Sequence, residues 1–289
     1  MAVSRKVSRR SFLAAASVAP AAWTAVQAAA QRRVPVGIEL YAVRTELGRD
    51  MLGTVSAVAK MGYQVVEFYS PYLNWSTDQA KEARKRLDDL GITCRSTHNG
   101  ANAFSGDGLK KAIELNQILG STTIVMASPP PKLVDAAAWR ALGAQMTEVV
   151  NTLKPLGMTA GFHNHQTEWR PVDGQRPMDI LAASTPREFV LQFDVGTAVE
   201  AGADPVAWVK ANPGRIKSLH LKDWGAGEGR GYNVAFGEGD VKWLDLLAAA
   251  ESVGGAEYYL IEQEHPGAIG ELAMAQKCLD NYRKLRGVR

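Results

Sequence analysis

The sequence predicts an α/β protein that folds as a single (β/α)8 barrel. The 259 residues after position 30 match the roughly 250 residues of such a barrel, and they contain eight strand-like runs. Each segment between the runs is long enough for one helix, and this alternation predicts a parallel sheet. An open doubly wound sheet shows the same alternation, but no glycine fingerprint opens the first helix, which favours the barrel.

The eight expected strands follow one another at a spacing near that of one strand-helix unit. They are Val36–Arg44, Gln64–Tyr69, Ile92–Asn99, Thr122–Ala127, Thr159–His165, Phe189–Val195, Ile216–Trp224 and Glu257–Glu264. Apolar residues recur at helical spacing in Ala80–Leu90, Leu109–Leu119 and Trp243–Val253. Ser76-Thr77-Asp78 can cap the second helix at its start. Left-handed residues are expected just after four helices, at Gly91, Gly120, Gly157 and Gly254.

A glycine-rich segment, Gly225–Gly239, follows the seventh expected strand. A disordered insertion is one interpretation of this composition. Tyr232, Val234 and Phe236 are unusual in a segment that never packs, so we expect an ordered loop that folds over the mouth of the barrel.

The first thirty residues are predicted to be a removable twin-arginine export signal. Ser8-Arg9-Arg10-Ser11-Phe12-Leu13 precedes an apolar stretch, Ala14–Val26, and the small residues Ala28–Ala30 suit signal cleavage. A membrane anchor is the alternative, but Pro20 interrupts a run that is shorter than the roughly 20 residues needed to span a bilayer. We expect a periplasmic protein whose barrel domain is residues 31–289, with no stable membrane insertion after signal removal.

Composition and charge exclude several classes of protein. With 46% hydrophobic and 22% charged residues the chain is neither disordered nor collagen-like, and Cys94 and Cys278 do not make a disulfide framework. The formal charge of +3 comes from the first thirty residues, because the remainder has 29 basic and 30 acidic side chains. This near-neutral remainder gives no electrostatic reason to expect nucleic acid as a partner.

Histidines and carboxylates collect at the C-terminal ends of the expected strands, where a (β/α)8 barrel carries its chemistry. The histidines are His98, His163, His165, His220 and His265, and the carboxylates are Glu67, Glu168, Asp194, Glu262 and Glu264. One such histidine alone is more simply explained as a hydrogen-bonded core residue. Together they predict a site for one divalent cation such as Mn²⁺, Zn²⁺, Co²⁺ or Mg²⁺.

Short motifs in a specific order carry a resemblance to a known family. They are Gly37-Ile38-Glu39-Leu40-Tyr41, Gly62-Tyr63, Val66-Glu67-Phe68, His98, Gly161-Phe162-His163-Asn164-His165, Phe193-Asp194-Val195-Gly196, Leu219-His220-Leu221-Lys222-Asp223 and Ile261-Glu262-Gln263-Glu264. On these motifs the chain resembles the sugar phosphate isomerase/epimerase family. These xylose isomerase-like TIM barrels include inosose dehydratases, tagatose-type epimerases and endonuclease IV.

The resemblance implies one divalent metal held by carboxylates of the fifth and eighth strands, an aspartate of the sixth and a histidine of the seventh. Asp194, His220 and Glu262 match directly. The fifth strand departs from the pattern, since His163 stands where epimerase relatives carry a glutamate. Either His163 or Glu168 can supply this ligand, and the charge of Glu168 favours it because it restores the usual ligand set.

The chemistry implied is proton abstraction next to a carbonyl, through an enediolate that the metal stabilises. The candidate acids and bases are Glu262, Glu264, His165 and Lys222. An alternative role for Lys222 is a structural ion pair with Asp223 or Asp194. An alternative role for Glu264 is to orient a metal ligand from behind. The residues assigned to substrate binding are His98, Glu67, Trp75, Trp169 and Trp224, whose indoles can stack on a sugar ring.

Export decides among the functions, because phosphorylated sugars and damaged DNA belong chiefly to the cytoplasm. We therefore expect an exported, metal-dependent isomerase or epimerase of a sugar, keto-sugar or cyclitol. A lyase or dehydratase acting on a 3-keto-glycoside or inosose at the same site is the first alternative, and a non-catalytic periplasmic sugar-binding protein is the second. The partner is a small carbohydrate in each case, and a homo-oligomer is compatible with the sequence.

Overall fold

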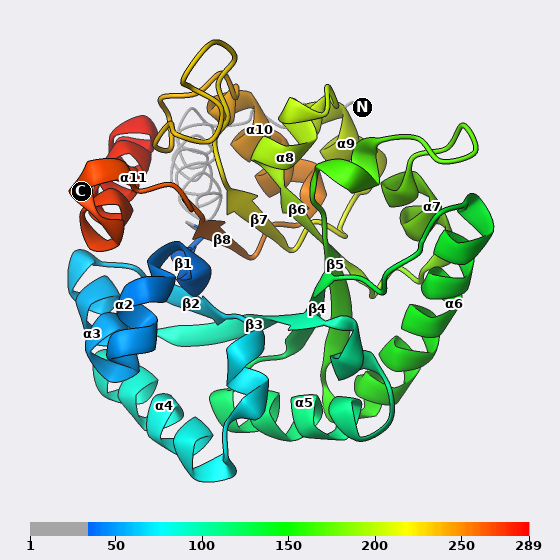
Figure 1. The fold of residues 1–289 in the computed structure, drawn as a ribbon, viewed down its shortest axis with the longest axis horizontal. Helices are drawn as coiled ribbons and strands as arrows, with labels where there is room; N and C mark the ends of the chain where they lie inside the picture. The colour runs from blue at the N-terminus through cyan, green and yellow to red at the C-terminus, as the bar shows by residue number, and fades with distance from the viewer. Residues whose placement is uncertain (1–33, 289) are drawn as a thin grey trace, which may run out of the picture. The chain divides into compact units, whose positions relative to one another are not determined.

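Eight parallel strands close into a barrel that is ringed by helices (Figure 1). The structure, a computed structural model, describes residues 34–288, so the predicted export signal lies outside the described residues. Each strand pairs with the next along the chain, and β1 pairs with β8 to close the barrel, with Ile38 opposite Ile261. The predicted (β/α)8 fold is confirmed.

Helices and strands alternate along the described residues. The strands are β1 (Val36–Glu39), β2 (Val65–Phe68), β3 (Thr93–Gly100), β4 (Thr123–Ser128), β5 (Thr159–His163), β6 (Val190–Asp194), β7 (Ser218–Leu221) and β8 (Tyr258–Ile261). The α-helices are α2 (Arg44–Arg49), α3 (Met51–Met61), α4 (Thr77–Leu90), α5 (Gly106–Leu119), α6 (Ala136–Leu153), α7 (Pro177–Ser184), α8 (Val195–Glu200), α9 (Pro205–Ala211), α10 (Trp243–Ala249) and α11 (Glu271–Arg286). The 3-10 turns are η1 (Leu40–Val43), η2 (Ser70–Asn74), η3 (Ala101–Phe104), η4 (Lys154–Leu156), η5 (Gln166–Trp169) and η7 (Gly267–Ile269), and η6 (Ala250–Gly254) is a π-turn.

All eight expected strands are present, but most end earlier than predicted. The expected strand Val36–Arg44 ends at Glu39, because the chain turns into η1, and Ile216–Trp224 shortens to Ser218–Leu221. Every residue is buried in five of the strands, namely β1, β2, β6, β7 and β8. Their sequences therefore show no alternation of buried and exposed residues whose end would mark the last paired residue.

The predicted helix ends are confirmed with one exception. Ser76 caps α4, where its hydroxyl accepts from the Gln79 amide. Left-handed residues follow helices at Gly91, Gly120 and Gly157. The prediction at Gly254 is wrong: the chain continues after α10 through the wider turn η6, so the left-handed residue is Gly255, with φ of 83°.

The loop after β7 is packed, as its aromatic residues predicted. The Asp223 carboxylate accepts hydrogen bonds from Gly237 N at 2.8 Å, Gly239 N at 3.1 Å and Trp243 Nε1 at 2.9 Å. Phe236 is buried, and its ring centroid lies 4.6 Å from that of Trp243. The loop is therefore held in place both by hydrogen bonds to Asp223 and by the packing of Phe236 against Trp243.

Two further properties concern the cysteines and the helices. Cys94 and Cys278 are both buried and free. Within residues 34–288, no helix combines the length and apolar composition that a membrane crossing requires.

Replacing Phe236 by alanine is expected to destabilise the protein by about 3–5 kcal/mol, since the change opens a cavity under the loop. Urea denaturation measures the free energy of unfolding. Ile269→Ala is the matched control: this side chain is 53% exposed, so its loss is expected to change the stability by less than about 0.5 kcal/mol. Equal stabilities of the two variants would contradict the packed loop.

Candidate metal centre

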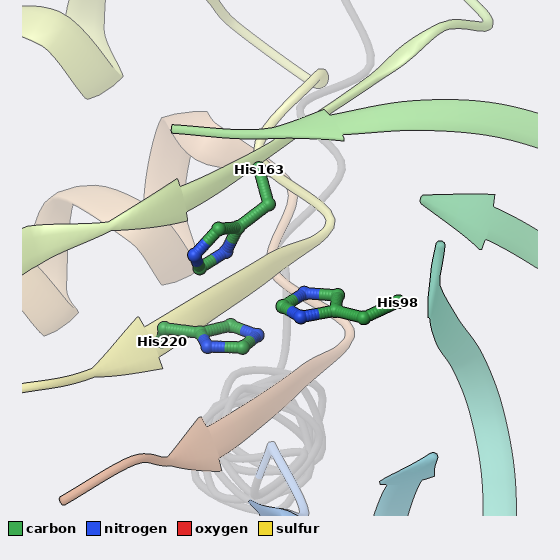
Figure 2. Close-up of side chains that lie close together, drawn as sticks. All are labelled: His98, His163 and His220. Atoms are coloured by element: carbon green, nitrogen blue, oxygen red, sulfur yellow. The ribbon is translucent and has the colours of Figure 1, made fainter. Parts of the chain in front are cut away.

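Three imidazoles from three different strands meet inside the barrel (Figure 2). His98 of β3, His163 of β5 and His220 of β7 have ring centroids 4.4–4.8 Å apart, and all three are buried. The His165 ring lies 5.0 Å from that of His163, next to the group. His265 is exposed and stacks on Tyr232 instead, so four of the five predicted histidines come together.

Four donors from neighbouring strand ends form a group of the size that one cation needs. His163, Asp194, His220 and Glu262 each offer a ligand atom, and these atoms all lie within 4.8 Å of one another. Asp194 Oδ2 and His163 Nδ1 are buried and have no hydrogen-bond partner in the described structure. Buried polar atoms are normally satisfied, so the unpartnered Asp194 Oδ2 in this group fits a bound divalent cation, and His163 Nε2 lies 3.8 Å from this oxygen.

Glu168 does not join this group. Its carboxylate accepts hydrogen bonds from His165 N at 2.6 Å and Thr167 Oγ1 at 2.8 Å, and it caps the turn η5. Of the two candidates for the fifth-strand ligand, the structure therefore brings His163 together with the other donors, and not Glu168.

His220 lies between two carboxylates. Its Nδ1 is 2.8 Å from Glu262 Oε2, and its Nε2 is 2.9 Å from Glu67 Oε1. Burial opposes the charged imidazole, but the hydrogen bonds and negative charges of these two residues raise the pKa of His220 to about 9. Burial likewise opposes the charged form of Glu67, but His98 and His220 hold the pKa of this carboxyl well below its usual range.

His163 is the opposite case. Burial and the neighbouring His220 and His98 hold the pKa of His163 well below its usual value. The ring is therefore neutral, which is the form that ligates metal ions. Burial raises the pKa of Asp194, and the charge of Lys222 opposes this shift.

Lys222 contacts the carboxylates of the cluster and lies over one ring of the β7 loop. Its Nζ lies 3.8 Å from Asp194 Oδ2 and 3.9 Å from Glu262 Oε2, and it donates a hydrogen bond to Glu264. Burial opposes its charge, but these carboxylates raise the pKa of Lys222 above its usual range. The Tyr232 ring of the β7 loop lies 5.4 Å from Nζ, so the loop contributes to the surroundings of the ammonium.

The residues assigned to substrate binding lie in different environments. Trp169 is buried against Phe193 and Trp208, as a core residue is. Trp75, packed edge-on against Phe68 and Tyr72, and Trp224 are half-buried. Glu67 and His98 are buried and contact each other, with 3.0 Å between His98 Nε2 and Glu67 Oε1.

Sequence reasoning missed Asn164 and Gln192. Asn164 Oδ1 accepts from Asp194 N at 3.0 Å, and its Nδ2 donates to Asp194 O at 3.0 Å and Thr197 Oγ1 at 2.9 Å. The side chain thus continues the pairing of β5 with β6 beyond the strand ends and holds the Asp194 backbone. Gln192 carried a usable signal, because it precedes Asp194 by two residues and so shares its face of β6.

Comparison with known proteins agrees with this architecture. The family model described as Xylose isomerase-like TIM barrel matches residues 55–284. An Escherichia coli (strain K12) protein with the provisional name L-ribulose-5-phosphate 3-epimerase SgbU is 25% identical over 218 residues, which cover 66% of this chain and 73% of that protein.

Two solved structures show the same fold. A sugar phosphate isomerase/epimerase from Parabacteroides distasonis ATCC 8503 matches with a TM-score of 0.73 and 21% identity, over 89% of this chain and 96% of that chain. The IOLI protein, solved with a bound zinc atom, matches with a TM-score of 0.69 and 14% identity, over 87% of this chain and 97% of that chain.

Replacing Asn164 by alanine leaves the buried Asp194 amide without an acceptor, and we expect a loss of about 1–3 kcal/mol in the free energy of unfolding. Urea denaturation measures it. Asn233→Ala is the control, because the Asn233 side chain is exposed and its Nδ2 donates to Gly229 O within the loop, and a change below about 0.5 kcal/mol is expected. If Asn164→Ala were as stable as the control, the side chain would not hold Asp194.

Proposed function

Because the chain belongs to the xylose isomerase-like TIM barrel family, we propose that it is a metal-dependent isomerase or epimerase of a sugar, keto-sugar or cyclitol. The observation that carries the proposal is the four-residue ligand group, in which the buried Asp194 Oδ2 has no hydrogen-bond partner. The epimerase name of the E. coli relative and the zinc in the IOLI protein support it.

His163, Asp194, His220 and Glu262 are the residues that would hold the cation. A bound divalent cation supplies positive charge for the oxygen on which negative charge develops when a proton leaves the carbon beside a carbonyl. Two imidazoles in the donor set suit Zn²⁺ better than Mg²⁺, which prefers oxygen ligands, and the two carboxylates are also compatible with Mn²⁺.

Proton transfer falls to side chains on two sides of this group. The pair of Lys222 and Glu264 comes from the ends of β7 and β8, and His165 follows β5. Epimerisation removes a proton from one face of a carbon and returns one to the other face, so it needs a carrier on each side. We assign these two roles to Lys222, which donates a hydrogen bond to Glu264, and to His165, whose ring lies 5.0 Å from that of His163.

The lyase alternative has one observation in its favour. The fifth strand contributes an imidazole, and the nearby Glu168 carboxylate is occupied by hydrogen bonds to His165 N and Thr167 Oγ1. A fifth-strand carboxylate base is therefore missing, and elimination from a 3-keto-glycoside or inosose needs a single base and an acid for the leaving group. Lys222 with Glu264 and His165 fill these roles equally well.

The preference for a substrate without phosphate rests on the predicted export signal, residues 1–30. The E. coli relative is named for a phosphorylated sugar. Export to the periplasm by the twin-arginine route stays a proposal from the sequence, as does a non-catalytic sugar-binding role.

Elemental analysis and calorimetric titration with Zn²⁺ or Mn²⁺ are expected to find about one ion per chain expressed from Gln31. Asp194→Asn, His220→Ala and His163→Ala each remove a ligand, so each should weaken binding by more than the roughly 10- to 100-fold that outer contacts contribute. Glu168→Gln is the control and should bind as the unchanged chain does. An unchanged chain that takes up no ion would refute metal dependence.

Lys222→Met is expected to lower kcat on a responsive keto-sugar by about 10²- to 10⁴-fold, the usual contribution of a positioned acid or base. The initial rate of product formation in D₂O gives kcat. The product identifies the reaction: deuterium beside the carbonyl indicates isomerisation or epimerisation, and release of the substituent indicates elimination. The control is Lys217→Met, because Lys217 pairs with Glu257 before β8 and outside the cluster. Sugar binding without either product, retained in Asp194→Asn, would favour the sugar-binding protein.

A further inference from the structure

Glu67 is fully buried in the barrel, and both of its carboxylate oxygens are occupied. Oε1 contacts His220 Nε2 at 2.9 Å and His98 Nε2 at 3.0 Å. Oε2 accepts from Gln192 Nε2 at 2.9 Å and from the Ser96 hydroxyl. These four neighbours leave little accepting capacity for a sugar hydroxyl, and Glu39, whose pKa burial and Glu67 hold well above its usual value, is a further neighbour of the carboxylate.

The partners of Glu67 fix where the protons lie. A carboxylate only accepts, so His220 Nε2 must carry a hydrogen to bond with it. Gln192 gives its amide nitrogen to Glu67 and turns its oxygen to His98 Nε2, 2.6 Å away, so that nitrogen also carries a hydrogen. Gln192 thereby ties the orientation of the His98 ring to the same carboxylate.

The other nitrogen of His220 faces the ligand group. Nδ1 lies 2.8 Å from Glu262 Oε2, and both residues belong to the set whose ligand atoms lie within 4.8 Å of one another. An imidazole that keeps its hydrogen on Nε2 offers only Nδ1 to a cation. A carboxylate behind a metal-binding histidine sets the tautomer and the ring orientation in this way.

We propose that Glu67 is a positioning residue that keeps the hydrogen on His220 Nε2, so that Nδ1, which gives up its own hydrogen on binding, is the nitrogen presented to a divalent cation. This inference rests on the proposed metal dependence of the chain. It replaces the prediction that Glu67 binds substrate. It also explains why a fully buried carboxylate lies in company with Gln192 and Ser96.

The test combines Zn²⁺ calorimetry with ¹⁵N NMR of the histidine rings in the chain expressed from Gln31. In the unchanged chain we expect a downfield Nε2–H resonance of His220 with and without Zn²⁺, and loss of the Nδ1 proton when Zn²⁺ binds. Glu67→Gln replaces one carboxylate oxygen by an amide NH₂ group, which must then face either the two imidazoles, His220 and His98, or Gln192 and Ser96. It is expected to shift the Nε2–H resonance and to weaken Zn²⁺ binding by about 10- to 100-fold.

Ser96→Ala is the matched control, because it removes a donor to Oε2 and leaves the contact of Oε1 with His220 in place. It should keep the Nε2–H resonance and lose less Zn²⁺ affinity than Glu67→Gln. Zn²⁺ bound at Nε2, or a Glu67→Gln chain with unchanged resonance and affinity, would overturn the assignment.

Two further outcomes keep the inference separate from folding and from the proposed function. Should Glu67→Gln not fold, Glu67→Asp keeps the charge but shortens its reach, and undiminished Zn²⁺ affinity in that variant overturns the assignment. A wild-type chain that binds no cation contradicts the proposed function. The Nε2–H resonance of metal-free His220 still reports the contact with Glu67, and its absence would refute that contact.

Discussion

Carboxylates buried inside the barrel need compensating donors, and the arrangement of the site follows from this requirement. Glu67, Asp194 and Glu262 are almost fully buried. An unpaired charge in the protein interior costs several kcal/mol. His220 and Lys222 supply the positive charge, and each contacts more than one carboxylate. Each of these two cations is shared between carboxylates, so a change at one member alters the charge balance of its neighbours.

The fold was predictable because a parallel barrel repeats one local pattern eight times. The apolar runs placed every strand, but they did not mark where pairing stops, since the last residues of β1 and β7 are as buried as the first. The clustering of His98, His163 and His220 was predictable for a related reason. The C-terminal ends of all strands in a parallel barrel lie on one rim, so the residue types at these ends are enough to predict which side chains come together.

The roles within the cluster were less accessible from sequence. Glu168 and His163 are five residues apart and equally plausible ligands by type, yet a local turn occupies the Glu168 carboxylate. Trp169 follows a strand end as a sugar-stacking residue would, but contacts from β6 and α9 enclose it. Such assignments depend on partners distant in the chain, which composition and periodicity do not reveal.

Lys222 and Asp223 are adjacent in the chain but serve different parts of the molecule. The ammonium of Lys222 faces Asp194 and Glu262, while the Asp223 carboxylate binds Gly237 N, Gly239 N and the Trp243 indole. One peptide unit therefore joins the lysine of the cluster to the carboxylate that anchors the loop. Loop grafting between relatives must consequently transfer residues 223–243 as one block, because a shorter graft separates the carboxylate from its anchor points and displaces the neighbouring lysine.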